Sequence, residues 1–397
     1  MEVYVVDWLS LLVRWLHLIA GIAWIGASFY FIMLDNSLLA PVKADDVARG
    51  VHGELWAVHG GGLYQSQKYL SGPKGEPLSN NLHWSKYEAY TTWLSGMALL
   101  AIIYWYGAGT FLIDTNVMAL TQAQAIGISM GAIVGGSLLY SAMCKLFDGK
   151  ETWLAGSLFI FVIALDWGLF QVFSARAAFL HVGAVLGTIM AANVFFVIIP
   201  GQKKMVAEIR AGREPDPNPG RLGKQRSVHN TYFTLPVLFI MISNHYPMTY
   251  SHPHGWAVLA VIMVAGALVR QFFVLRHRGE LKPLYIGIAV LLLIAAIVVL
   301  APRPREATGV RATTFAEVRV IVAQRCVGCH AAQPTMAGFA QPPKGVTLET
   351  AEQILAHAPK VAETVASRYM PIGNLTQMTD AERERIAAWF REGAKAQ

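Results

Sequence analysis

Apolar residues gather into eight long runs over the first three quarters of the chain, and polar segments separate these runs. The hydrocarbon core of a bilayer is ~30 Å thick, which a helix of about 20 residues crosses. The pattern therefore predicts an all-α fold with an eight-helix transmembrane bundle over residues 1–301. The predicted helices lie near residues 9–34, 89–107, 125–147, 153–173, 176–199, 227–243, 255–275 and 283–301.

Glycines recur every four residues in two of the predicted helices, where they would let helix backbones approach closely. They are Gly127, Gly131 and Gly135 in the third helix and Gly183 and Gly187 in the fifth. The first apolar run is too long for the core of a cleavable signal and has no basic leader, so we expect it to remain as a helix.

The pattern changes after the eighth run. Residues 302–313 (PRPREATGVRAT) are interrupted by prolines and predict a linker. Fully extended at ~3.3 Å per residue, this linker would reach ~40 Å, so the next domain stays close to the membrane surface. Residues 314–397 have the helical pattern of a soluble domain, with a further helix expected over residues 345–360.

The first and last helices of this soluble domain are each predicted to begin at a capping box, a threonine followed three residues later by a glutamate. The two pairs are Thr314 with Glu317 and Thr379 with Glu382. Terminal helices that pack across a haem are the plan of a small cytochrome c domain, which is the fold that we expect here.

Composition supports a membrane protein. Of the 397 residues, 54% are hydrophobic and only 14% are charged, which is too apolar for a soluble protein of this length. The net charge of +7 comes mostly from alternate loops, where positive charge sets membrane topology, so we expect no nucleic-acid partner.

The positive-inside rule predicts that both termini and the soluble domain lie on the periplasmic side of a bacterial inner membrane. The basic loops carry Lys43, Arg49, Lys68, Lys74 and Lys86; Lys145 and Lys150; Lys203, Lys204, Arg210, Arg213, Arg221, Lys224 and Arg226; and Arg276, Arg278 and Lys282.

The sequence CVGCH at residues 326–330 has the spacing of a haem c attachment site. Cys326 and Cys329 would bond the haem covalently and His330 would ligate its iron. A zinc site would need a second pair of ligands, and the domain offers only His357 besides. A redox dithiol would need a preceding strand, where the pattern predicts a helix. One haem c is therefore the favoured cofactor.

A second axial ligand for this haem must come from farther along the chain. Met370, in RYMPIG, stands before a proline in a short loop, and a thioether ligand would raise the reduction potential. Met336 follows His330 so closely that it would fall on the wrong side of the ring, and Met378 adjoins the last helix. The predicted iron ligands are His330 and Met370.

Ionisable residues at membrane depth are rare and usually functional. The predicted helices contain Arg14, His17, Asp166 and His181. His17 and His181 occupy similar positions in the first and fifth helices, in the outer half of the membrane, and Arg14 shares a helix face with His17. Each also has an ordinary explanation, because an arginine can extend to the interface and a buried histidine can bond a carbonyl.

Four further histidines are expected near the inner surface, namely His52, His59, His83 and His229. His52 and His59 are seven residues apart and would share one face if their segment is helical. Three glycines follow His59 and would end such a helix. With nearby tryptophans and tyrosines, His59, His83 and His229 resemble a site for a second haem or a planar substrate, and the alternative is a solvated loop.

Three membrane segments, WAVHGGGLY, KYEAYTTWLSG and HNTYFTLPVLFIMISNHYP, occur together with CVGCH. In this combination, and over nearly its full length, the chain resembles the bacterial integral-membrane cytochrome c urate oxidases, also called urate hydroxylases. The resemblance implies oxidation of urate to 5-hydroxyisourate in purine breakdown, with water supplying the new hydroxyl oxygen. Electrons would pass to haem c and then to an acceptor such as a soluble cytochrome or a terminal oxidase.

Urate is an anionic, planar purine, so its site needs a cation, aromatic walls and a base with a pKa near neutrality. Arg14, His17 and His181 are the predicted catalytic residues, because they would provide the cation and the base on the side of the haem c domain. A site among the inner histidines would instead require electrons to cross most of ~30 Å of membrane. That arrangement would need a haem b as an intermediate carrier.

Two other functions are compatible with part of the pattern. One is a haem-containing respiratory quinol-oxidising or terminal-oxidase subunit, although such oxidases commonly use adjacent histidine ligands and the sequence has no His-His dipeptide. The other is a membrane anchor for a cytochrome, which would not need eight helices with polar residues inside them.

Overall fold

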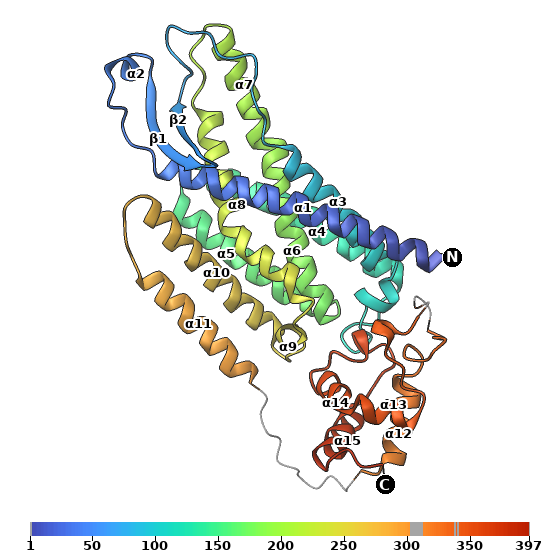
Figure 1. The fold of residues 1–397 in the computed structure, drawn as a ribbon. Helices are drawn as coiled ribbons and strands as arrows, with labels where there is room; N and C mark the ends of the chain where they lie inside the picture. The colour runs from blue at the N-terminus through green and yellow to red at the C-terminus, as the bar shows by residue number, and fades with distance from the viewer. Residues whose placement is uncertain (1, 302–312, 337–338, 340, 397) are drawn as a thin grey trace.

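The computed structural model describes residues 2–301, 313–336, 339 and 341–396. Residues 2–301 form a long helical bundle, and residues 313–396 form a smaller helical domain at one end of it (Figure 1). We call these the N-terminal bundle and the C-terminal domain. The predicted linker, residues 302–313, lies outside the described residues except for Thr313.

A helix occupies each of the eight segments that the apolar runs predict. These are α1 (Glu2–Asn36), α3 (Tyr87–Leu100), α4 (Gln122–Leu146), α5 (Glu151–Phe170), α6 (Ala175–Ala192), α8 (Asn218–Ser243), α10 (Gly255–His277) and α11 (Leu284–Leu300). Helix α6 continues through the π-helical segment η3 (Asn193–Ile198) into α7 (Ile199–Arg210), so the fifth predicted helix runs well past its expected end.

Among the described residues, five helices are long and apolar enough to cross a membrane: α1, α4, α5, the continuous α6–α7 and α10. Helix α11 is apolar but has only 17 residues. Helix α3 passes into two π-helical segments, η1 (Ala101–Trp105) and η2 (Ala108–Leu112), and the first half of α8 is polar. The count of eight membrane crossings therefore stays a prediction.

The all-α prediction is wrong in one segment. After the short helix α2 (Ala44–Ala48), strands β1 (Val51–His59) and β2 (Gly62–Tyr69) form an antiparallel hairpin. Gly60 and Gly61 join the strands with φ angles of 56° and 80°, which suits a two-residue hairpin turn. His52 and His59 consequently lie on a strand, where both are exposed, and they do not share a helical face.

The glycines that were expected to let helices approach closely do so in α6 at one position and do not do so in α4. A Cβ at Gly127, Gly131 or Gly135 would meet no atom within 4 Å, so these glycines do not bring α4 close to a neighbour. In α6, by contrast, a Cβ at Gly183 would lie 2.6 Å from Cγ2 of Ile240 on α8. Gly183 is therefore the glycine that allows close approach of α6 and α8, and Gly187 faces open space.

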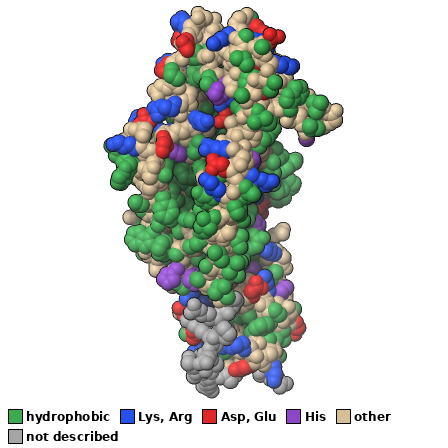
Figure 2. All heavy atoms as spheres, turned by 90° about the vertical axis from the view of Figure 1, so that its left-hand side faces the viewer, with side chains coloured by type: hydrophobic (Ala, Val, Ile, Leu, Met, Phe, Trp, Pro, Cys, Tyr) green, Lys and Arg blue, Asp and Glu red, His purple; other side chains and the backbone are tan. Residues whose placement is uncertain are grey.

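Charge and apolar surface are separated along the bundle. Figure 2 shows hydrophobic side chains covering the middle of one face, with most charged side chains toward the two ends. The exposed apolar residues include many on α1, α4, α5 and α11. The hairpin, α2 and α7 lie at the end of the bundle away from the C-terminal domain (Figure 1). This surface is compatible with a membrane around the middle of the bundle.

The C-terminal domain has its own core. Its helices are α12 (Phe315–Arg325), α13 (Ala351–Ala356), α14 (Ala358–Ala366) and α15 (Asp380–Arg391), with the 3-10 turns η4 (Pro343–Gly345) and η5 (Ile372–Asn374). Both predicted capping boxes are confirmed, at the starts of α12 and α15. Phe315 stacks on Trp389 with ring centroids 5.7 Å apart, which joins the terminal helices. The helix expected over residues 345–360 begins only at Ala351 and is divided into α13 and α14, the second of which continues to Ala366.

The C-terminal domain contacts the bundle through the loop that contains η5. A Cβ at Gly373 would lie 3.1 Å from the carbonyl oxygen of Thr110 in η2. The side chain of Tyr369 packs against the hydrophobic core of the bundle. This contact places the two candidate sites described below next to each other.

We expect the two glycines of α6 to respond differently to substitution. Gly183→Ala should destabilise the protein by about 1–3 kcal/mol, because its new methyl group would overpack against Ile240. Gly187→Ala, the matched control, should be neutral or stabilising by up to ~1 kcal/mol, because alanine is the better helix former. Thermal unfolding of detergent-purified protein, followed by circular dichroism, measures both. Equal midpoints would contradict the packing described for Gly183.

Candidate functional site

The CVGCH motif lines a cavity of about 210 Å³ in the C-terminal domain. Cys326, Cys329 and His330 line it from the segment after α12, and Met370 lines it from the loop between α14 and α15. Most of the remaining lining is apolar and includes Val346, Leu348, Phe339, Val361, Val365, Ile372 and Leu375. We call this space the cysteine cavity. All four residues that the sequence predicts to hold haem c line this cavity.

The donor set in the cysteine cavity fits a haem c. The Nδ1 atom of His330 lies 2.9 Å from the backbone oxygen of Val346, and a carbonyl can only accept, so Nδ1 carries the proton. The other ring nitrogen, Nε2, then has the free lone pair that an iron ligand requires. Two cysteines, an imidazole of defined tautomer and a thioether therefore share one mostly apolar space.

A buried arginine holds the loop that carries Met370. Arg383 on α15 is 8% exposed, and its guanidinium donates to the backbone oxygens of Val365 and Met370 at 2.9 and 2.7 Å. It also donates to Oδ1 of Asn374 at 2.9 Å. These bonds use both terminal nitrogens of the side chain, so the loop between α14 and α15 is fixed from the last helix.

The other two methionines lie elsewhere in the domain. Met378 is 3% exposed within the hydrophobic core, and its backbone nitrogen donates to Asn374. Met336 lies beside Gly328, to whose carbonyl its own backbone nitrogen donates. Neither lines the cysteine cavity, whereas Met370 does.

The two alternatives for CVGCH find little support. The described residues contain no group of three or more His, Cys, Asp or Glu side chains that could hold a metal ion, as a zinc site would need. The segment before Cys326 is helix α12, whereas a thioredoxin-like dithiol would follow a strand. His357, the further ligand considered for zinc, also lines the cysteine cavity, but among the described residues it forms no such group with the motif side chains.

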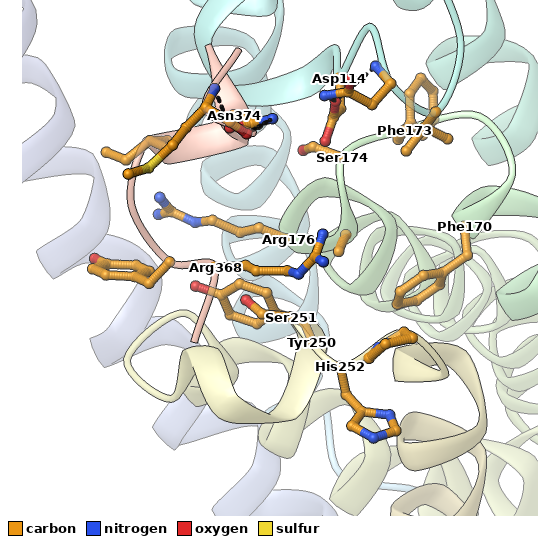
Figure 3. A pocket seen from close by; sticks show the side chains of 18 of the residues that line it. Asp114, Phe170, Phe173, Ser174, Arg176, Tyr250, Ser251, His252, Arg368 and Asn374 are labelled. Atoms are coloured by element: carbon orange, nitrogen blue, oxygen red, sulfur yellow. Dashed lines mark hydrogen bonds between the residues drawn. The ribbon is translucent and has the colours of Figure 1, made fainter. Parts of the chain in front are cut away.

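A second and larger cavity, of about 510 Å³, lies between the C-terminal domain and the bundle. Figure 3 shows that Arg176 of α6 and Arg368 of the C-terminal domain extend into the space between the two parts. Its aromatic lining comes from Phe111, Phe170, Phe173, Tyr250 and Tyr369. We call it the interdomain cavity. Tyr369 and Ile372 line both cavities, so one loop separates them.

Arginines outnumber carboxylates around the interdomain cavity. Arg176, Arg368 and Arg383 line it together with Asp114 and Asp380. Arg368 pairs with Asp380 at 2.7 Å. Nε of Arg176 donates to Oδ1 of Asn244 at 2.9 Å, and because this partner is a neutral amide it leaves the charge of the guanidinium in place. The lining as a whole thus favours an anion.

Tyr250, at the end of the short helix α9 (Pro247–Tyr250), brings a buried hydroxyl to the same cavity. The residue is 4% exposed, and its ring contacts Phe179 with centroids 5.9 Å apart. Its hydroxyl has no hydrogen-bond partner among the described residues. Burial raises the pKa of this phenol, so it stays protonated and can donate. Buried hydroxyls without a partner are uncommon and call for an explanation.

Among the predicted catalytic residues, His181 packs against a residue that lines this cavity. It is fully buried, its Nε2 lies 2.7 Å from Oγ of Ser129, and its Nδ1 lies 2.8 Å from the backbone oxygen of Ala177. The ring of Phe173, which lines the interdomain cavity, packs on the His181 ring with centroids 4.8 Å apart. The ring of Phe173 therefore lies between His181 and the interdomain cavity.

His17 and Arg14 are on α1, which contributes no residue to the lining of the two cavities. Nδ1 of His17 lies 2.9 Å from the backbone oxygen of Thr92 and 3.1 Å from Oγ of Ser95, both on α3. Arg14 is exposed on α1. Neither residue lines the two cavities. A catalytic role for Arg14, His17 and His181 stays a prediction.

The inner histidines occupy separate environments. His59 ends β1 and His83 lies in the loop before α3, and both are exposed. His229 is inside α8, where its Nδ1 lies 2.7 Å from the hydroxyl of Tyr140. A second haem or substrate held jointly by these three histidines stays a prediction, and the described contacts do not join them.

The residues missed by sequence reasoning are those that line the interdomain cavity. The position of Arg176 in the sequence could have identified it as a candidate. It is the one basic residue in the turn after the fourth predicted helix, on the side where the positive-inside rule expects few. Tyr250 and Arg368 carried no such signal, because Tyr250 meets Arg176 only when α9 packs beside α6, and Arg368 meets it only when the C-terminal domain docks on the bundle.

Residues 3–301 match the family model described as "Urate oxidase N-terminal". The matched range covers the described bundle and about three quarters of the chain, and it ends before the C-terminal domain. No curated protein and no solved structure matches the chain.

Met370→Ala should abolish the long-wavelength absorption band of a thioether–iron bond and lower the reduction potential, while the haem stays covalently bound. Met378→Ala and Met336→Ala should keep the band, because neither residue lines the cysteine cavity. Visible spectra and redox titrations of the three purified variants check this. A band that survives in Met370→Ala and disappears in another variant would reassign the ligand.

Proposed function

The chain belongs to the urate oxidase N-terminal family, and from this premise we propose that it oxidises urate to 5-hydroxyisourate and passes the electrons to a covalently bound haem c. Cys326 and Cys329 would attach the haem, and His330 and Met370 would ligate its iron. The observation that carries the proposal is the cysteine cavity, where these four side chains meet beside the family-matched bundle.

The reaction balances without oxygen as a substrate. Urate and one water give 5-hydroxyisourate, two protons and two electrons, with the new C5–O bond formed from water. When bound, haem c would accept electrons one at a time, so a downstream one-electron acceptor such as a soluble cytochrome or a terminal oxidase must take the first before the second arrives. The chain's own part is to bind the purine, exclude competing partners and receive protons.

We further propose that the bundle crosses a bacterial inner membrane eight times, with both termini and the C-terminal domain in the periplasm. The five long apolar helices support a membrane location. The basic residues predicted to face the cytoplasm gather at the hairpin end, where Lys68 and Lys224 both pair with Asp35 and Arg221 pairs with Asp148. The C-terminal domain lies at the opposite end (Figure 1).

Removal of either motif cysteine should change how the haem is held. Cys326→Ser and Cys329→Ser should each leave one vinyl group unsaturated and shift the pyridine haemochrome band to longer wavelength. The double variant should release its haem into acid acetone. Cys144→Ser, which changes the cysteine of the bundle, is the control and should match the unaltered protein. Unshifted bands in both single variants would contradict haem attachment at CVGCH.

Urate should reduce the haem without oxygen. Oxidised protein mixed with urate in an anaerobic stopped-flow instrument should show the reduced haem c bands, with two haems reduced per urate consumed. Xanthine, which lacks the oxygen at C8, is the control. In air the protein should form no hydrogen peroxide in proportion to urate. Failure of urate to reduce a haem that dithionite reduces would overturn the proposed function.

A further inference from the structure

We infer that urate binds in the interdomain cavity, where Arg176 and Tyr250 of the bundle and Arg368 of the C-terminal domain would hold it. The inference rests on the proposed function and adds to it the place of binding. At about 510 Å³ the cavity falls within the range of about 300–1,000 Å³ that is typical of small-molecule sites. Residues from both parts of the chain line it.

The charge of the cavity suits the urate anion. Three arginines and two aspartates line it, and the guanidinium of Arg176 is paired with the neutral amide of Asn244. Arg368 shares its charge with Asp380 at the solvent side of the cavity. Planar guanidinium groups match the in-plane oxygens and nitrogens of a purine anion better than a lysine would.

A helix terminus adds to this preference. Ser174, Ala175 and Arg176 line the cavity at the first turn of α6, which continues for 36 residues to Arg210. The side-chain oxygen of Ser174 caps the turn by accepting from the backbone nitrogen of Ala177. The first N–H groups of a long helix carry partial positive charge and lack intrahelical acceptors. They therefore favour an anion at the same place as Arg176.

The buried hydroxyl of Tyr250 is an independent observation that points to a ligand. It belongs to a residue that is 4% exposed and lines the cavity, and it has no hydrogen-bond partner among the described residues. Leaving such a group unpaired costs about 1–3 kcal/mol. A carbonyl oxygen or ring nitrogen of urate would accept its proton. Phe111, Phe170 and Phe173 add apolar walls for the purine faces.

The position of the cavity also explains how electrons would leave urate. Residues 368–373 form the wall between the two cavities: Arg368 lines the interdomain cavity, Met370 lines the cysteine cavity, and Tyr369 and Ile372 line both. Electron transfer from this cavity would cross one loop, so no second haem in the membrane is required. His252 lines the interdomain cavity as well and offers an imidazole for the released protons.

The test measures urate binding separately from electron transfer. When the haem is already reduced by dithionite, urate can bind but cannot pass on electrons, so equilibrium dialysis with labelled urate reports affinity alone. Arg176→Gln and Arg368→Gln should each weaken binding at least ~10-fold, because each removes a charge-assisted hydrogen bond. Tyr250→Phe should weaken it about 5-fold by loss of one neutral donor.

Two further variants keep the result interpretable. Arg278→Gln is the matched control, because Nε of Arg278 donates to the amide oxygen of Asn36 at 2.9 Å, as Nε of Arg176 does to Asn244, but at the other end of the bundle. It should bind urate like the unaltered protein. Arg176→Lys keeps the charge and the fold, and it should bind more tightly than Arg176→Gln while its haem content stays unchanged.

The outcomes separate the two proposals. If the unaltered protein binds urate and is reduced by it, while Arg176→Gln, Arg176→Lys and Arg368→Gln bind as tightly as the control, urate binds elsewhere and this inference is wrong. If the unaltered protein neither binds urate nor is reduced by it, the proposed function is wrong and this inference falls with it. Weaker binding in the cavity variants, with the control unchanged, supports the interdomain site.

Discussion

The close contact between Gly373 and the carbonyl oxygen of Thr110 is the constraint on which the rest of the arrangement depends. Gly373 has a φ angle of 57°, and a Cβ there would lie 3.1 Å from this oxygen, so both its conformation and its surroundings favour glycine. The contact brings the loop at residues 368–373 against η2 of the bundle. Without it the interdomain cavity would be an open surface, and the cysteine cavity would be remote from the bundle.

The parts of the fold that were predicted correctly are determined by short stretches of the sequence. A run of about 20 apolar residues is sufficient to indicate a membrane helix, and a helix occupies each of the eight runs. Likewise the pairs Thr314–Glu317 and Thr379–Glu382 satisfy helix ends through bonds within four residues. CVGCH is also local, and its three side chains line one cavity.

The all-α prediction failed at one segment, and the site predictions lacked the tertiary contacts that would decide them. At the hairpin the all-α prediction was wrong, because Gly60 and Gly61 adopt positive φ angles that favour a two-residue turn, and the flanking residues then pair as strands. In the apolar helices, the prediction for His181 stays open: the residue is buried with both ring nitrogens bonded, to Ser129 and Ala177, and it lines neither cavity. The interdomain cavity has no local signal, because its residues come from separate elements.

The location of Arg176 follows from the cost of placing charge in a membrane. A cation at the bilayer centre is expensive, and a soluble anion would have to lose its hydration to reach it there. At the first turn of α6, beside a short helix and a second domain, Arg176 is partly buried at the very start of the apolar span Ala175–Arg210. An anion can then approach from water and meet guanidinium groups in a partly desolvated cavity. The proposed haem c site lies across one loop from this cavity, so electrons need not pass through the apolar middle of the bundle. The bundle need only hold η2, α6 and α9 in place for the domain that docks on them.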